Sequence, residues 1–154
     1  CYVKELSDEQ FYEYALPFYE RLDYLEGYDL RYLSGLLKNR CEIFSDVGRL
    51  TEFLTAFDGY DLNLFVNAKW KTDCALAKSM LPGLIDLCDK AFGSLHDALV
   101  SFAEANGWKK GQVLWVFRIA ITGAQNTPGG AVEMAELLGK DKTAARLKAS
   151  LSRL

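Results

Sequence analysis

The sequence predicts an all-α protein, a helical bundle or cage made of two small helical subdomains. Apolar residues recur at the spacing of amphipathic helices along most of the chain, whereas the apolar–polar alternation of strands is scarce. No hairpin signal such as Asn-Gly separates two apolar runs. With 154 residues, 50% of them hydrophobic, the chain is long enough to bury a core. We therefore expect helices packed on helices.

The first part of the chain has clear helix start and stop signals. Ser7 and Gln10 form a capping box, which predicts a helix from there to about Leu25 with a kink at Pro17. Gly27 ends this helix. The spacing of apolar residues predicts further helices over residues 29–43, 45–57 and 61–79.

Trp70 stands between Lys69 and Lys71 in the last of these helices. A tryptophan flanked by lysines can stack on a nucleobase, and it can also cover the edge of a core, which is the more frequent role. Both roles remain open from the sequence.

The run Met80-Leu81-Pro82-Gly83 combines the two strongest helix breakers. We place a boundary there, which gives an N-terminal helical subdomain of residues 1–81 and a C-terminal helical subdomain of residues 82–154. In the second subdomain, helices are expected over residues 84–91, 94–105, 110–122, 128–138 and 141–153.

The helix expected at residues 110–122 has two different faces. Its apolar face consists of Val113, Leu114, Phe117, Ala120 and Ile121. Trp115, Arg118 and Thr122 fall on the opposite side and are expected to point outward. An aromatic ring, a guanidinium and a hydroxyl on one exposed face form a candidate recognition surface.

The loop after Gly123 leads into a second candidate feature. Thr127 is predicted to cap the next helix and Pro128 to be its first residue. Gly129 and Gly130 then fall in the first turn, where a ligand can approach backbone N–H groups closely. The same pattern also builds ordinary helical hairpins, so the residues by themselves leave both interpretations open.

The net charge of −3 hides an uneven distribution. Residues 107–154 contain eight Lys and Arg against three Asp and Glu, a net charge of +5, so residues 1–106 carry −8. Such a split favours an anionic partner for the C-terminal part, although solvated helix faces can differ in charge by chance.

Motifs for catalysis and metal binding are absent from the sequence, so we predict no catalytic residue and no metal site. His96 is the only histidine and has no partner at ligand spacing. The cysteines lie too far apart for a zinc site or a dense disulfide framework, which predicts reduced thiols. They are Cys1, Cys41, Cys74 and Cys88.

No apolar run reaches the roughly 20 residues of a membrane span, and no signal peptide opens the chain. We therefore expect a cytoplasmic protein without a membrane partner. Because the chain begins with Cys1 rather than a methionine, we also expect it to be part of a longer protein.

Several short motifs occur in a fixed order between residues 108 and 154. They are Gly111-Gln112-Val113-Leu114, Phe117-Arg118-Ile119-Ala120-Ile121-Thr122-Gly123, Thr127-Pro128-Gly129, Leu137-Leu138-Gly139-Lys140 and Arg146-Leu147. This pattern resembles the C-terminal anticodon-binding domain of bacterial glutamyl-tRNA synthetases, a class I family. The first two thirds of the chain is similar more loosely, through Leu36-Leu37, Arg40 and Ile43-Phe44-Ser45-Asp46.

The resemblance implies a helical cage of two subdomains that holds the anticodon loop. By position, Arg118 matches an arginine that contacts an anticodon base, and Gln125 matches another neighbour of the anticodon. Arg40 matches the arginine that reads the third anticodon base and separates glutamate from glutamine tRNAs. The loop and helix start that surround the unstacked bases match Thr127, Pro128, Gly129, Gly130 and Ala131.

The resemblance also implies the function of a longer protein, a glutamate-tRNA ligase that attaches glutamate to tRNA in protein biosynthesis. ATP and Mg²⁺ would be used by its catalytic domain, whose signature motifs do not occur in these residues, so this part alone is expected to be inactive and to need no cofactor. The expected partner is tRNA(Glu), with tRNA(Gln) left open, and we expect a monomer that does not bind DNA. The alternative is a non-catalytic helical protein-interaction module whose basic C-terminal face meets an acidic protein.

Overall fold

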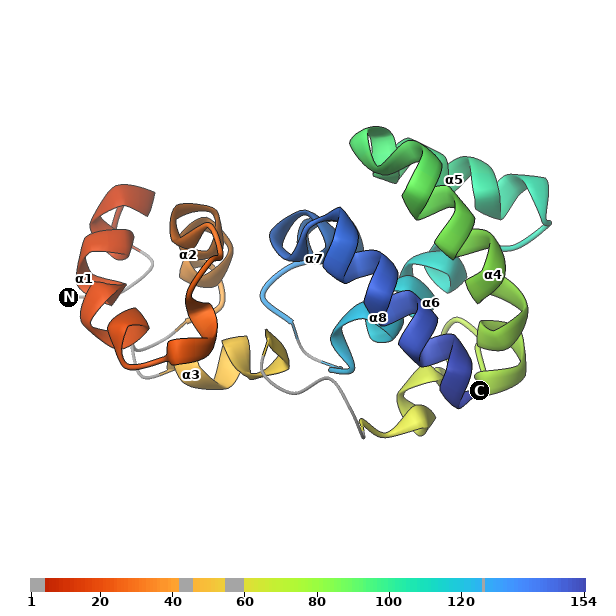
Figure 1. The fold of residues 1–154 in the computed structure, drawn as a ribbon, viewed down its shortest axis with the longest axis horizontal. Helices are drawn as coiled ribbons and strands as arrows, with labels where there is room; N and C mark the ends of the chain where they lie inside the picture. Colours follow the sequence, from red (N-terminus) through yellow and green to blue (C-terminus); the bar gives the residue numbers. More distant parts are fainter. Residues whose placement is uncertain (1–4, 42–45, 55–59, 126) are drawn as a thin grey trace. The chain divides into compact units, whose positions relative to one another are not determined.

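A computed structural model describes residues 5–41, 46–54, 60–125 and 127–154 (Figure 1). Within these residues all regular elements are α-helices or short 3₁₀ helices, and the β structure is limited to an isolated bridge between Asn67 and Thr72. The predicted all-α class is confirmed.

The chain divides into two compact units. Unit 1 consists of Cys1–Ala56 and Asn126–Gly129, and unit 2 consists of Phe57–Gln125 and Gly130–Leu154. The boundary predicted at residues 81 and 82 is wrong, because helix α4 (Cys74–Ala91) continues through it with Pro82 inside. Gly83 has a packing role there: a Cβ at this position would lie 2.5 Å from the ring of Phe102. The glycine thus marks a close contact between helices rather than a turn.

Unit 1 contains α1 (Asp8–Glu20), α2 (Leu30–Lys38), α3 (Asp46–Thr51) and the 3₁₀ helices η2 (Asp23–Leu25) and η3 (Glu52–Leu54). The capping box of Ser7 and Gln10 is confirmed. The first two helices are shorter than predicted, since α1 ends before Arg21 and α2 ends before Asn39. The expected helix ends within residues 42–45 and 55–57 lie outside the described residues.

The core of unit 1 forms where α1 packs on α2. Its fully buried side chains include Phe11, Ala15, Leu33 and Leu37. Tyr19 lies among them with its hydroxyl 2.6 Å from the Ser34 hydroxyl, and burial raises the pKa of Tyr19 to about 12.

Unit 2 contains η4 (Leu62–Phe65), α4, η5 (Phe92–Ser94), α5 (Leu95–Ala105), α6 (Lys110–Thr122), α7 (Ala131–Leu138) and α8 (Lys140–Arg153). The helix α6 contacts all the other α-helices of this unit (Figure 1). Its residues Val113, Val116, Phe117, Ile119, Ala120 and Ile121 are completely buried. This central position holds α6 firmly in place.

The helix predicted over residues 61–79 does not form as one element. Asp61, Asn67 and Asp73 each accept a backbone hydrogen bond from two or three residues ahead, at 2.8–2.9 Å. Such side-chain bonds stabilise turns at the expense of a helix. The segment therefore begins with η4, makes a turn closed by the Asn67–Thr72 bridge, and starts α4 only at Cys74.

Tyr60 ties the beginning of unit 2 to its last helix. Its hydroxyl lies 2.6 Å from the Ser150 hydroxyl, and Arg153 donates a 2.9 Å hydrogen bond to the Tyr60 carbonyl. The Arg153 guanidinium also lies 4.6 Å from the centre of the Tyr60 ring.

Among the described helices, none combines the length and hydropathy that a membrane-spanning segment requires.

Candidate nucleic-acid interface

The helix α6 positions the central side chains of the candidate site. It ends at Gly123, which has a φ of 61° and donates its N–H to the Ile119 carbonyl, as predicted for a glycine stop. Of the predicted apolar face, Leu114 is only partly covered and the other members are buried. Trp115 and Arg118 are half-buried on the other side of the helix.

Trp115 and Arg118 form a stacked pair. The Arg118 guanidinium lies 4.9 Å from the centre of the Trp115 ring, a typical cation–π distance. Its Nη1 donates to the Gln125 carbonyl at 2.8 Å, and the indole Nε1 of Trp115 donates to the Leu64 carbonyl at 3.0 Å. Both flat groups are therefore held in a fixed orientation before any ligand arrives.

Thr122 does not belong to the exposed face, contrary to the prediction. It is 3% exposed, and its hydroxyl donates to the Arg118 carbonyl at 2.7 Å. This is the bond to the preceding turn that Thr favours inside helices. Its helical position was predicted correctly, but the chain after Gly123 covers it: the Ala124 N–H donates to the Thr122 hydroxyl at 3.3 Å.

A hollow of about 220 Å³ lies against this pair, and we call it the Arg118 hollow. Its lining residues are Trp70, Gly111, Leu114, Trp115, Arg118, Gly130 and Ala131. The structure thus brings four of the predicted site residues, Trp115, Arg118, Gly130 and Ala131, to one place. The hollow is mainly apolar, with one guanidinium at its wall, which suits a flat aromatic ligand that carries hydrogen-bond acceptors.

Trp70 is the wall residue that no helical pattern could place. Its ring packs on α6 at Gly111, where a Cβ would lie 2.3 Å from the ring. Gln112 donates a 2.9 Å hydrogen bond to the Trp70 carbonyl, and the Lys69 ammonium lies 5.0 Å from the ring centre. Trp70 covers an edge of the core, which is one of the two roles left open by the sequence, and it also lines the hollow. In the sequence, the feature that could have pointed to Trp70 as a site residue was its position between Lys69 and Lys71.

The predicted start of α7 is wrong. The helix begins at Ala131 with Gly130 as N-cap, and the Thr127 hydroxyl donates to the Gly129 carbonyl at 2.6 Å instead of capping the helix. The Gly130 N–H, expected to be open to a ligand, donates to the Glu133 carboxylate at 3.1 Å. The Thr127 hydroxyl bonds to the Gly129 carbonyl because the turn before α7 brings the two groups within reach.

The remaining predicted residues are distributed over both units. Thr127, Pro128 and Gly129 are buried and belong to unit 1. Arg40 also belongs to unit 1, where it is exposed just after α2. Gln125 is exposed in unit 2, and its backbone carbonyl binds Arg118.

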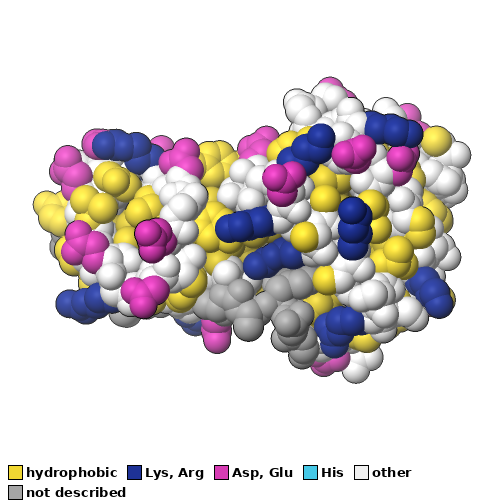
Figure 2. All heavy atoms as spheres, viewed as in Figure 1, with side chains coloured by type: hydrophobic (Ala, Val, Ile, Leu, Met, Phe, Trp, Pro, Cys, Tyr) yellow, Lys and Arg dark blue, Asp and Glu magenta, His cyan; other side chains and the backbone are white. Residues whose placement is uncertain are grey.

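Some basic side chains of the C-terminal part bind other groups of the protein, and others are exposed to solvent. Arg146 donates to the Ile121 carbonyl at 2.9 Å, and Lys140 pairs with Asp89 at 3.8 Å. Lys109, Lys110 and Lys148 are exposed. Figure 2 shows several Lys and Arg side chains on the face where α7 and α8 lie. These exposed lysines are the cations that an anion near unit 2 would meet.

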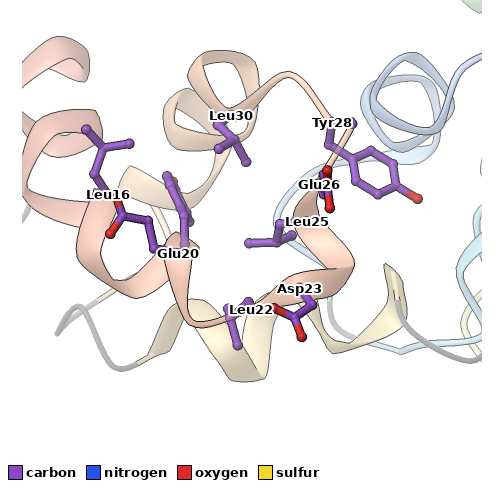
Figure 3. Close-up of a pocket in the computed structure, with 10 residues that line it drawn as sticks. Leu16, Glu20, Leu22, Asp23, Leu25, Glu26, Tyr28 and Leu30 are labelled. Carbon is purple, nitrogen blue, oxygen red and sulfur yellow. The ribbon is translucent and has the colours of Figure 1, made fainter.

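Unit 1 has a larger hollow, of about 360 Å³, between the end of α1 and the start of α2 (Figure 3). Leucines line it, and Glu20, Asp23 and Glu26 surround them with carboxylates. These charges repel phosphate, so this hollow does not suit a nucleic acid.

Among the described residues, no three or more His, Cys, Asp or Glu side chains lie together where they could hold a metal ion. Cys41 and Cys88 are buried and Cys74 is half-buried, and Cys1 lies outside the described residues. His96 is exposed on α5, 3.7 Å from the Asp97 carboxylate, as expected for a surface histidine.

Comparisons with known proteins identify the family of the chain. The family model described as anticodon binding domain matches residues 10–151. The glutamate–tRNA ligase of Lachnoclostridium phytofermentans is 33% identical over 157 residues, which cover 99% of this chain and 32% of that protein. The glutamate–tRNA ligase of Clostridium novyi is 34% identical over 160 residues, covering 99% and 33%. The chain thus spans about a third of the length of these relatives.

A solved structure shows the same fold. The crystal structure of a glutamate tRNA ligase from Elizabethkingia meningosepticum in complex with its amino acid superimposes with a TM-score of 0.83 at 20% identity. The match covers 99% of this chain and 30% of the other. Since the family model covers nearly the whole sequence, the chain belongs to the anticodon binding domain family.

Proposed function

We propose that this chain binds the anticodon loop of tRNA(Glu) as the C-terminal part of a glutamate-tRNA ligase. The observation that carries the proposal is the Trp115–Arg118 pair at the wall of the Arg118 hollow. The family and the similarity to glutamate–tRNA ligases support the choice of ligand.

The chemistry of the Arg118 hollow fits an unpaired base. Proteins recognise loop bases by unstacking them, laying them on aromatic or guanidinium planes, and bonding to their edges. Here the Trp115 ring, the Trp70 ring and the Arg118 guanidinium supply flat surfaces in one hollow. The bonds from Arg118 to the Gln125 carbonyl and from Trp115 to the Leu64 carbonyl reduce the entropy lost on binding.

The rest of the proposed activity concerns the longer protein. Attachment of glutamate would take place in a catalytic domain that uses ATP and Mg²⁺, while this part acts in the cytoplasm by selecting the tRNA. Arg40, Gln125 and residues 127–131 would contribute further contacts to the loop. We propose that the chain acts as a monomer and that Arg40 determines whether it binds tRNA(Gln) in addition to tRNA(Glu).

The test is titration of the chain with the anticodon stem-loop of tRNA(Glu) and with a stem-loop of scrambled anticodon. We expect Arg118→Ala to weaken binding of the cognate stem-loop by about 1–3 kcal/mol, the scale of one bidentate base contact. Arg118→Lys keeps the charge but loses the planar fork, so it should lose most of the same affinity.

Lys148→Ala is the matched control, because Lys148 is an exposed cation of unit 2 that does not line the Arg118 hollow. Arg118 also holds the 124–125 loop, so thermal unfolding must show that the variants are folded. Equal losses in Arg118→Ala and Lys148→Ala, or equal binding of both stem-loops by the unmodified chain, would contradict the proposal.

A further inference from the structure

A second hollow, of about 300 Å³, also has Trp115 in its wall, and we call it the Asn63 hollow. Its other lining residues are Asn63, Leu64, Val66, Asn67, Ala68 and Gln125, all in unit 2. It shares Trp115 with the Arg118 hollow, so the two sites adjoin the same indole.

The Asn63 hollow offers apolar surface for stacking. Trp115 is half-buried there, and Val66 is 54% exposed, one of two large hydrophobic side chains among the described residues that are left so open. An exposed valine beside a half-exposed tryptophan in a concave site is typical of a binding surface.

The polar groups of the hollow are neutral carboxamides. The side chains of Asn63 and Gln125 are exposed and have no hydrogen-bond partner among the residues that the structure describes. Each carboxamide presents a donor and an acceptor side by side, which matches the alternating donors and acceptors on the edge of a nucleobase. No charged side chain lines the hollow, so a phosphate or a carboxylate would find no partner inside it.

The hollow is held in shape by backbone and side-chain bonds. The Asn63 N–H donates to the Asp61 carboxylate at 2.9 Å, and the Thr72 hydroxyl donates to the Phe65 carbonyl at 2.6 Å. The Trp115 indole fixes Leu64. These bonds come from three separate parts of the sequence, which makes the wall rigid enough to select a ligand by shape.

Two lysines stand next to this wall without lining it. Lys69 and Lys71 lie in the turn between Asn67 and Thr72, and both are exposed. Cations beside a neutral hollow are the arrangement expected when a base enters and its phosphate stays outside.

We propose that the Asn63 hollow binds a second unpaired nucleobase of the same RNA loop, which is stacked against Trp115 and Val66 and read at its edge by the carboxamides of Asn63 and Gln125. This inference rests on the proposed function, because it requires an RNA loop at unit 2. It assigns a base-reading role to a segment, residues 63–67, that no motif of the sequence marked.

The experiment uses the anticodon stem-loop of tRNA(Glu) and a set of stem-loops in which one loop nucleotide at a time lacks its base. The protein variants are Asn63→Ala with Gln125→Ala, Trp70→Ala, because Trp70 lines the Arg118 hollow and not the Asn63 hollow, and Asn106→Ala. The last is a matched control, because Asn106 is an exposed carboxamide of unit 2 outside both hollows.

We expect the Asn63→Ala, Gln125→Ala double variant to bind the intact stem-loop about 5- to 100-fold more weakly, the range of one good edge contact. At one abasic position the double variant and the unmodified chain should bind equally, since the contact is already missing. That position should differ from the one found with Trp70→Ala, and Asn106→Ala should bind normally.

An unchanged affinity of the double variant, a loss of the same size at every abasic position, or the same position for both hollows would overturn the inference. If the unmodified chain prefers the cognate to the scrambled stem-loop in any of these cases, the proposed function survives without it. If the unmodified chain shows no such preference, both fall.

Discussion

Gly111→Ala tests whether the Trp70 ring packs as closely on α6 as the structure shows. The substitution adds one methyl group in the first turn of α6, where the Cβ would lie 2.3–2.4 Å from three atoms of the Trp70 ring. Real contacts of this kind require a much larger separation, so the ring must leave its position. The Gln112 bond to the Trp70 carbonyl restrains the backbone that would have to follow.

Two opposing effects decide the size of the change. Replacing glycine by alanine in a helix stabilises it by at most about 1 kcal/mol. Forcing an extra methyl group into a packed contact costs about 1–3 kcal/mol. The second effect is the larger, so we expect Gly111→Ala to lower the free energy of unfolding by about 0.5–2 kcal/mol.

The assay is urea unfolding of four proteins: the unmodified chain, Gly111→Ala, Trp70→Ala and the double variant. Once the ring is removed, the added methyl group meets nothing, so Gly111→Ala should become neutral or stabilising in the Trp70→Ala background. Gly93→Ala is the control, because a Cβ at Gly93 would have no neighbour within 4 Å. The reasoning is refuted if Gly111→Ala has the same effect with and without the Trp70 ring.

Three further predictions concern single residues. Gly123→Ala should lower the free energy of unfolding by about 1–3 kcal/mol in denaturant titrations, because Gly123 has a φ of 61° and its Cβ would lie 2.8 Å from the Tyr60 ring; an unchanged midpoint would contradict it. Burial raises the pKa of Tyr19 from 10.0 to about 12, so between these pH values the unfolded tyrosine ionises first and stability falls as the pH rises. Between pH 9 and pH 11 the unmodified chain should lose about 1 kcal/mol more stability than Tyr19→Phe, and parallel pH profiles would exclude this cause. Arg40→Gln should reduce the preference for tRNA(Glu) over tRNA(Gln) about fivefold or more in binding titrations, whereas equal discrimination before and after would remove Arg40 from the site.

Local signals were sufficient for much of the fold. The capping box of Ser7 and Gln10 and the glycine stop at Gly123 depend only on neighbours within one turn, and both form as predicted. The helices α6 and α8 were predicted within one residue, because their apolar spacing is long and regular.

The wrong boundary and the wrong helix have non-local or competing causes. Gly83 looked like a break, but its lack of a side chain serves the approach of Phe102 from another helix. The segment 61–79 had helical spacing, but Asp61, Asn67 and Asp73 captured backbone N–H groups in turns. Neither effect can be weighed from spacing alone.

The candidate site was predicted only in part, because some of its residues come from distant parts of the chain. Trp115 and Arg118 lie on one helix, so their proximity follows from the helical repeat. Trp70 and Leu64 reach them from 45 and 51 positions earlier in the chain, a separation at which a single sequence contains no pairing signal. The Thr127 cap did not form because α7 begins only after Gly130, and the Thr127 hydroxyl donates to the nearby Gly129 carbonyl instead.

The contacts between Tyr60 and the end of α8 have a consequence for folding during synthesis. Ser150 and Arg153 contact Tyr60 across 90 and 93 positions, and α4 has its most extensive packing with α8. During synthesis, α1 and α2 can pair as soon as both have left the ribosome, because they are neighbours in the chain. The buried face of α4, with Met80, Leu81 and Leu84, has to wait until residue 153 has emerged. Unit 2 is therefore the part of the nascent chain that we expect chaperones to protect.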